Sequence, residues 1–139
     1  MDESRAGRGS PPPVGGYGLP VKFAVMMHTN PTHSKALSEE EVSSIEAKHA
    51  KLLEELEAAG ELINGAGLHL PEETTTIRIA AGKPESSTGP VAAGDEHVTA
   101  YYLLECPDRD RAVEIASRIL DSHVTAVEVR QVHNSTGLD

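Results

Sequence analysis

One long amphipathic segment constrains the fold more than any other part of this 139-residue chain. Ser38 followed by Glu41 has the form of a capping box, and Gly60 follows the last residue of the periodic pattern. The pattern predicts a helix over residues 39–59, because apolar residues recur at steps of three and four. His49 occupies a place on this apolar stripe, where an aliphatic side chain would be usual. An ionisable ring is therefore expected at the buried side of the helix or at its edge.

Five short runs outside this helix are typical of β-strands, because they are apolar or alternate between apolar and polar residues. They cover residues 21–28, 61–70, 74–82, 98–106 and 125–132. Pro107 and Asp108 open a second predicted helix, which extends to about Leu120. Residues 29–37 and 85–97 are typical of loops.

These elements predict an α+β fold, a ferredoxin-like β-α-β-β-α-β arrangement that takes four of the five strands, with two helices on one face of an antiparallel sheet. The chain has the usual length of a single domain, which we expect over residues 21–133. The other face of such a sheet is bare, and this predicts a two-fold dimer.

The ends of the chain differ in composition from the predicted domain. Residues 1–20 are nearly half Gly and Pro, so we expect a flexible arm there. In the alternative, Tyr17 and Leu19 anchor this arm over a neighbouring subunit or a cavity mouth. Residues 134–139 are expected to be a frayed tail.

Composition narrows the classes of function. A formal net charge of −10 repels phosphate backbones and anionic lipids, so we expect neither nucleic acid nor membrane as a partner. The single cysteine, Cys106, excludes an internal disulfide, and no apolar stretch of a secretory signal is present, which favours a cytoplasmic location. Phosphate-binding glycine loops and serine-hydrolase motifs are also missing from the sequence. No cofactor is expected.

Histidines are the main candidates for chemistry. His49 suits a general acid or base if it lies in an apolar cavity beside a carboxylate; the alternative is a ring that packs at the edge of the stripe. His28 and His33 could share a metal, but no third ligand has suitable spacing, so a surface loop is the favoured interpretation. His69 and His97 would lie near the cavity mouth if the strands pair as predicted.

Three further polar candidates flank or lie on the strand predicted over residues 98–106. Glu96 precedes this strand and could hold a substrate or orient a histidine, although exposed loop acids are the ordinary expectation. Tyr101 and Tyr102 point to opposite faces of a strand, so one hydroxyl could reach the helix side. Cys106 has no base or cation adjacent in sequence and is expected to be inert.

Several short motifs follow one another in a fixed order. They are Gly67-Leu68, Thr75-Thr76-Ile77-Arg78, Thr88-Gly89-Pro90-Val91, Tyr101-Tyr102-Leu103 and Val127-Glu128-Val129-Arg130. In order and spacing they resemble the DGPF branch of the YCII-related family, over residues 21–132. The sequence departs from that branch where Thr88 and Val91 replace the aspartate and the phenylalanine of the motif.

The resemblance implies a dimeric α+β barrel with a cavity between sheet and helices. Some members look like lyases or dehalogenating enzymes that pair a helix-borne histidine with an aspartate. His49 matches that histidine, Asp121 is the nearest match for the aspartate, and Glu96 matches a glutamate of the branch.

From residues and resemblance together we expect a cofactor-independent acid/base enzyme of lyase, isomerase or cyclase type, of a kind that would suit a biosynthetic pathway. His49 and Asp121 are the expected catalytic residues. The expected substrate contacts are His28, His69, Glu96, His97 and Tyr101. The expected partners are a small-molecule substrate and a second copy of the chain. The alternative is a non-catalytic dimeric module that binds a small ligand or a protein.

Overall fold

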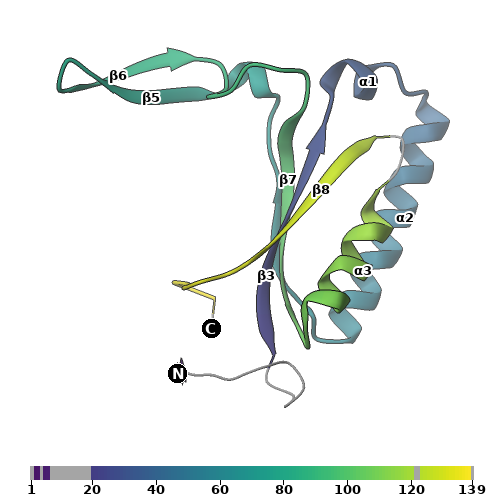
Figure 1. The fold of residues 1–139 in the computed structure, drawn as a ribbon. Helices are drawn as coiled ribbons and strands as arrows, with labels where there is room; N and C mark the ends of the chain where they lie inside the picture. Colours follow the sequence, from purple (N-terminus) through teal and green to yellow (C-terminus); the bar gives the residue numbers. More distant parts are fainter. Residues whose placement is uncertain (1, 4, 7–19, 121–122, 139) are drawn as a thin grey trace.

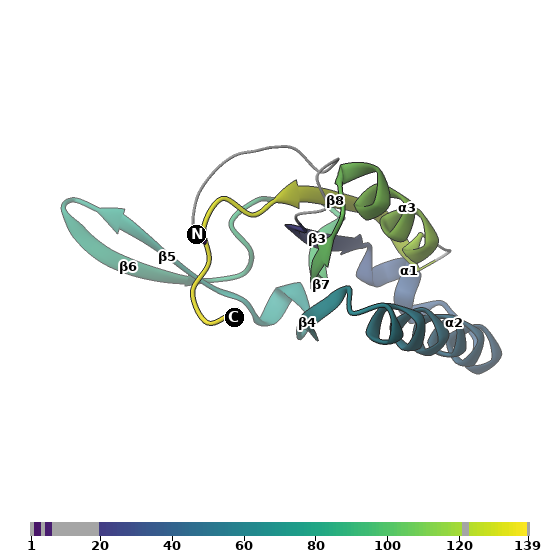
Figure 2. The same ribbon diagram turned by 90° about the horizontal axis from the view of Figure 1, so that it is seen from below.

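A four-stranded antiparallel sheet forms the centre of the molecule, and the computed structural model describes residues 2–3, 5–6, 20–120 and 123–138. The strands of this sheet are β3 (Val21–Thr29), β4 (Leu62–Gly67), β7 (His97–Cys106) and β8 (Val124–Gln131). They lie in the order β4-β7-β3-β8. The helices α2 (Glu39–Ala58) and α3 (Arg109–Ile119) cover one face of the sheet (Figures 1 and 2). The predicted α+β class is confirmed.

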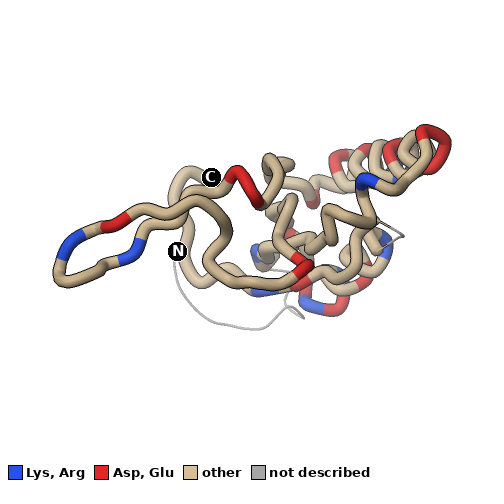
Figure 3. The backbone as a smooth tube through the Cα atoms, turned by 90° about the horizontal axis from the view of Figure 1, so that it is seen from above, with Lys and Arg blue, Asp and Glu red and all other residues tan. Residues whose placement is uncertain are grey.

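Helix α2 begins and ends as its sequence predicts, within one residue. The Ser38 hydroxyl accepts a hydrogen bond from the Glu41 amide at 3.1 Å, and the Glu41 carboxylate accepts one from the Ser38 amide at 2.9 Å. This reciprocal pair satisfies backbone donors that the first helical turn leaves open. At the other end Ala59 is the C-cap, and Gly60 adopts a left-handed φ of 71°. Glutamates outnumber lysines along this helix (Figure 3).

The hydrophobic core lies between the sheet and the two helices. Strand β3 turns alternate residues inward, and α2 and α3 contribute residues at helical spacing. The largest fully buried side chains are Phe23, Val25, Leu56, Leu104, Cys106, Ile115 and Ile119. Burying each large apolar side chain stabilises the fold by roughly 1.5–3 kcal/mol. Most of these residues lie toward the end of the sheet where β3 begins.

The segment predicted as a third strand does not join the central sheet. It forms β5 (Thr75–Ala80), which pairs with β6 (Lys83–Thr88) as a separate hairpin that projects from the domain (Figures 1 and 2). Ala81 and Gly82 form its two-residue turn with φ values of 52° and 80°. Residues 85–88 are therefore strand, where a loop was predicted. Strand β6 is exposed along its whole length, so it lacks the apolar alternation that signals a strand.

Two short helices lie in segments where sequence periodicity gives no signal. Helix α1 (Pro31–Lys35) follows β3, and Asn30 caps it by accepting a hydrogen bond from the Thr32 amide at 3.0 Å. The 3₁₀ helix η2 (Pro71–Glu73) follows β4. Five residues are too few to display a helical repeat, so the prediction of a loop between β3 and α2 was incomplete.

The first described residues of the chain lie outside the central sheet. Strands β1 (Asp2–Glu3) and β2 (Arg5–Ala6) form a two-residue antiparallel pair. Most of the predicted arm, with Tyr17 and Leu19, lies outside the described residues, so its character stays a prediction. Within the described segments, no helix combines the length and the apolar character needed to cross a membrane.

Candidate active site

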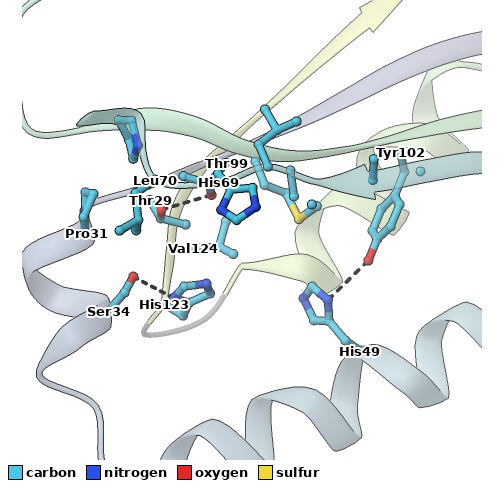
Figure 4. A pocket seen from close by; sticks show the side chains of 17 residues that line it. Thr29, Pro31, Ser34, His49, His69, Leu70, Thr99, Tyr102, His123 and Val124 are labelled. Atoms are coloured by element: carbon cyan, nitrogen blue, oxygen red, sulfur yellow. Dashed lines mark hydrogen bonds between the residues drawn. The ribbon is translucent and has the colours of Figure 1, made fainter. Parts of the chain in front are cut away.

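A cavity of about 520 Å³ lies on the helix-covered side of the sheet, at the end where β3 finishes (Figure 4). Most strand residues that line it are small, among them Thr29, Gly65, Gly67, Thr99 and Ala100. The other apolar lining consists of Met27, Pro31, Ala66, Leu68, Leu70, Pro71 and Val124. Because small side chains cannot reach across to helix α2, the space between sheet and helix stays open here. A volume of this size suits a small organic ligand.

His49 extends from helix α2 into this cavity (Figure 4). It lies one helical step before the buried residues Leu52 and Leu56, as its place on the stripe predicts. Its Nδ1 is 3.3 Å from the Tyr102 hydroxyl. Its Nε2 is buried and has no hydrogen-bond partner among the described residues. A buried polar atom without a partner is uncommon in a folded protein and marks a place that can accept a polar ligand atom.

Tyr102 keeps its proton at neutral pH. Burial raises the pKa of its phenol above the ordinary value of 10.0, so the hydroxyl is neutral. If the hydroxyl donates to His49 Nδ1, the proton of a neutral imidazole sits on Nε2. The other tautomer leaves Nε2 as an acceptor. In either state the nitrogen facing the cavity can exchange a proton with a bound molecule.

The Tyr102 ring occupies space that a side chain at position 65 would need, and Gly65 leaves that space free. A Cβ at this position would overlap the ring atom Cδ1 and come within 2.8 Å of the Tyr101 carbonyl oxygen. Strand β4 can therefore lie beside this tyrosine only with glycine at position 65. At Gly67, by contrast, a Cβ would meet nothing within 4 Å.

A second polar pair lines the cavity from different elements. Ser34 of helix α1 and His123, just before β8, approach at 2.9 Å between Oγ and Nδ1 (Figure 4). Nothing in the sequence pattern pointed to them, because Ser34 lies in a helix too short to predict and His123 lies at a predicted element boundary. Nearby, the Thr29 hydroxyl donates to the Thr99 hydroxyl at 3.0 Å.

The predicted substrate contacts divide between the two faces of the sheet. His69 lines the cavity, although its side chain is 92% exposed, and its Nδ1 is 4.0 Å from the Glu73 carboxylate. His28 belongs to the opposite face, where its Nε2 is 2.6 Å from a Glu128 oxygen. Tyr101 is not among the residues that line the cavity, and its neighbour Tyr102 is.

The other predicted site residues either lie away from His49 or are not among the residues that the structure describes. His97 lines a smaller, more open pocket with Asp95, and its Nε2 is 2.8 Å from the Gly94 carbonyl oxygen. Glu96 is exposed in the adjoining loop. Asp121 lies outside the described residues, so its pairing with His49 stays a prediction. In the described part of the chain, no three His, Cys, Asp or Glu residues are grouped as metal ligands would be.

Cys106 has the environment of a structural thiol. It is 1% exposed, and burial raises its pKa to about 11, with the nearby Glu61 carboxylate adding to the shift. A thiol with a raised pKa is a poor nucleophile at neutral pH.

Comparison with known proteins adds one match. The family model described as the YCII-related domain matches residues 21–134, which include the central sheet, both long helices and every described residue of the cavity. None of the curated proteins matches this chain. The match spans most of the chain, and the protein therefore belongs to the YCII-related family.

Proposed function

We propose that this protein is an enzyme that moves protons on a small organic molecule bound in the cavity, with His49 as the general acid or base. The observation that carries the proposal is the buried Nε2 of His49, which lines the cavity and has no partner among the described residues. A buried donor or acceptor left unsatisfied costs about 1–3 kcal/mol, and a ligand that hydrogen-bonds to it removes that cost.

The surroundings of His49 suit proton transfer. An imidazole has two ring nitrogens, one of which can accept a proton while the other donates one, so it can act as base or as acid. The apolar lining strengthens electrostatic contacts with a bound molecule, because little water screens them. Tyr102 holds the ring through Nδ1, and Asp121 is the proposed carboxylate partner from the family resemblance. Elimination, isomerisation and cyclisation all need this kind of group.

Proton exchange measured by NMR tests the proposal. Wild-type protein is incubated in D₂O with a panel of ketones and β-hydroxycarbonyl compounds, and deuterium incorporation next to the carbonyl is followed. We expect His49→Gln to reduce the exchange rate at least about 100-fold, with ligand affinity kept within about threefold. His33→Gln, at an exposed position of helix α1, is the matched control and should retain the wild-type rate.

The rival is a non-catalytic module that binds a small ligand in the same cavity. Its support is the lining, which is mostly apolar and would hold a ligand by shape alone. If His49→Gln binds and exchanges ligands as the wild type does, the acid/base proposal is wrong and the binding module takes its place.

We also propose that two copies of the chain associate through the face of the sheet away from the helices. That face carries the half-buried residues Ala24, Met26, Tyr101 and Leu103. The projecting hairpin adds Ile77 and Ile79, which are 66% and 71% exposed. An isolated two-stranded hairpin is marginally stable in water, so packing against a second copy would stabilise it.

Sedimentation velocity tests this association. The wild type should sediment as a dimer at micromolar concentration, and Met26→Lys, which places a charge on the bare face, should sediment as a monomer. A monomeric wild type would contradict the dimer. Val113→Lys, on the exposed side of helix α3, is the control and should leave the dimer intact.

A further inference from the structure

Besides the Thr29–Thr99 contact, two polar pairs that each contain a histidine line the cavity, and they lie apart. His49 and Tyr102 meet at one side, and Ser34 and His123 meet at the other (Figure 4). The first pair comes from helix α2 and strand β7, and the second from helix α1 and the segment before β8. Apolar residues of the same cavity, including Met27 and Val124, belong to neither pair. A molecule that fills this space can therefore meet an imidazole at each end and mostly apolar surface between them.

The Ser34–His123 contact orients the second imidazole. At 2.9 Å between Oγ and Nδ1 it has ordinary hydrogen-bond length, whereas the contact of the Ser34 hydroxyl with the Asn30 carbonyl oxygen is longer, at 3.4 Å. The serine thus has a donor role and an acceptor role available beside the ring. Asn30 also caps helix α1, so the same residue sets the start of the helix and the surroundings of Ser34.

Among the described residues, no Lys or Arg lines the cavity, so they offer an anionic ligand no fixed cation. The chain as a whole carries a formal charge of −10. Carboxylates and phosphates need a cation or several oriented amides to enter an apolar site, so an uncharged ligand fits better.

We propose that Ser34 and His123 form a second substrate anchor, and that the substrate is an uncharged molecule with an oxygen function at each end. One end meets His49 and the other meets His123. This inference rests on the proposed function only in taking the cavity as the substrate site. His123 is a binding and positioning residue in it, and His49 remains the group that moves the proton.

Three matched probes test this proposal by NMR titration of the full chain. They are 1,4-benzenedimethanol with two hydroxyl groups, benzyl alcohol with one, and 4-(hydroxymethyl)benzoate with an anionic end. In the wild type we expect the diol to bind about fivefold tighter than benzyl alcohol, which is the usual value of one additional hydrogen bond. The benzoate should bind more weakly than the diol.

Two variants assign the second hydroxyl to its anchor. His123→Phe and the nearly isosteric Ser34→Ala should each bring the ratio of the two alcohol affinities close to one. His33→Phe makes the same change at an exposed position next to Ser34 and should leave the ratio at its wild-type value. Benzyl alcohol should bind all three variants about equally.

Each contrary outcome overturns a stated part of the proposal. An unchanged ratio in both His123→Phe and Ser34→Ala removes the second anchor. Benzoate affinity equal to that of the diol removes the preference for uncharged molecules, and no binding of any probe to the wild type at millimolar concentration removes the substrate class. These readouts measure binding, so they are independent of the exchange rate lost in His49→Gln, and either proposal can fail while the other stands.

Discussion

The two ends of the helix-covered face of the sheet share its strands and helix α2 but differ in side-chain size. At one end Leu56, Leu104 and Ile115 are fully buried between the sheet and the helices. At the other end Gly65, Gly67, Thr99 and Ala100 leave a cavity of about 520 Å³. The strand order is the same at both ends, but helix α3 contributes Ile115 to the packed end and no residue to the cavity lining, where helix α1 contributes Pro31 and Ser34. The difference therefore arises from side-chain volume and from helix placement together.

An ion pair also covers the packed end. Arg111 of helix α3 donates to both carboxylate oxygens of Glu61, which is 8% exposed. A bidentate pair of this kind satisfies a buried carboxylate that would otherwise be costly. At the open end, the buried Nε2 of His49 has no hydrogen-bond partner among the described residues. One end therefore serves stability, and the other retains unsatisfied polarity that a ligand can use.

The largest expected effect comes from deleting the same atoms at both ends. Leu56→Ala should lower the free energy of unfolding by about 3 kcal/mol, because Leu56 is fully buried and leaves a void. Leu70→Ala, at a cavity-lining position that is 42% exposed, should cost less than about 1 kcal/mol. Urea unfolding of both variants measures the two values. Equal losses would mean that the open end is as tightly packed as the closed one.

A smaller effect concerns the packed end, whose stability depends on pH through Cys106. Burial raises the pKa of Cys106 from 9.0 to about 11, so between these values the unfolded chain loses a proton that the folded chain keeps. Its stabilising contribution is complete below pH 9 and falls as pH rises toward 11, by roughly 2–3 kcal/mol in all, because one pKa unit corresponds to about 1.4 kcal/mol. Urea unfolding at pH 8 and pH 10.5 measures the loss. Cys106→Ala should show a shallower decline than the wild type; an identical decline would assign the effect to other groups.

The smallest expected effect concerns two glycines of strand β4. Gly65→Ala should cost about 1–2 kcal/mol and displace the Tyr102 ring, because the added Cβ has no room. Gly67→Ala should change stability by less than about 0.5 kcal/mol. Thermal unfolding gives the stability difference, and the Tyr102 ring resonances report its displacement. Similar behaviour of the two variants would show that the ring position does not depend on Gly65.

Local signals in the sequence correctly predicted the helices and strands in which those signals occur. The capping box at Ser38 and Glu41 placed helix α2 within a residue, and its repeat placed His49 on the inward side. Apolar runs placed the four strands of the central sheet. The hairpin was misassigned because β6 has no buried face, and helix α1 was missed because five residues show no period.

The cavity could be anticipated only in part. The family resemblance pointed to His49, but no sequence pattern joined it with Tyr102, which lies 53 positions further along the chain. Strand alternation required one of Tyr101 and Tyr102 to face the helices without saying which. Ser34 and His123 are 89 positions apart and meet only because β3 and β8 are neighbours. Contacts of this kind depend on strand order and on turns, which pattern alone leaves open.

Strand β4 lies at the edge of the sheet, where it pairs with β7, and Gly67 near its end borders both open space and the cavity. A larger side chain there would reduce the room for a ligand without disturbing the packed end. A substitution of Gly67 would therefore change which ligands fit the cavity while the stability of the fold stays nearly the same. Such a position allows members of one lineage to diverge in ligand size while they inherit an unchanged scaffold.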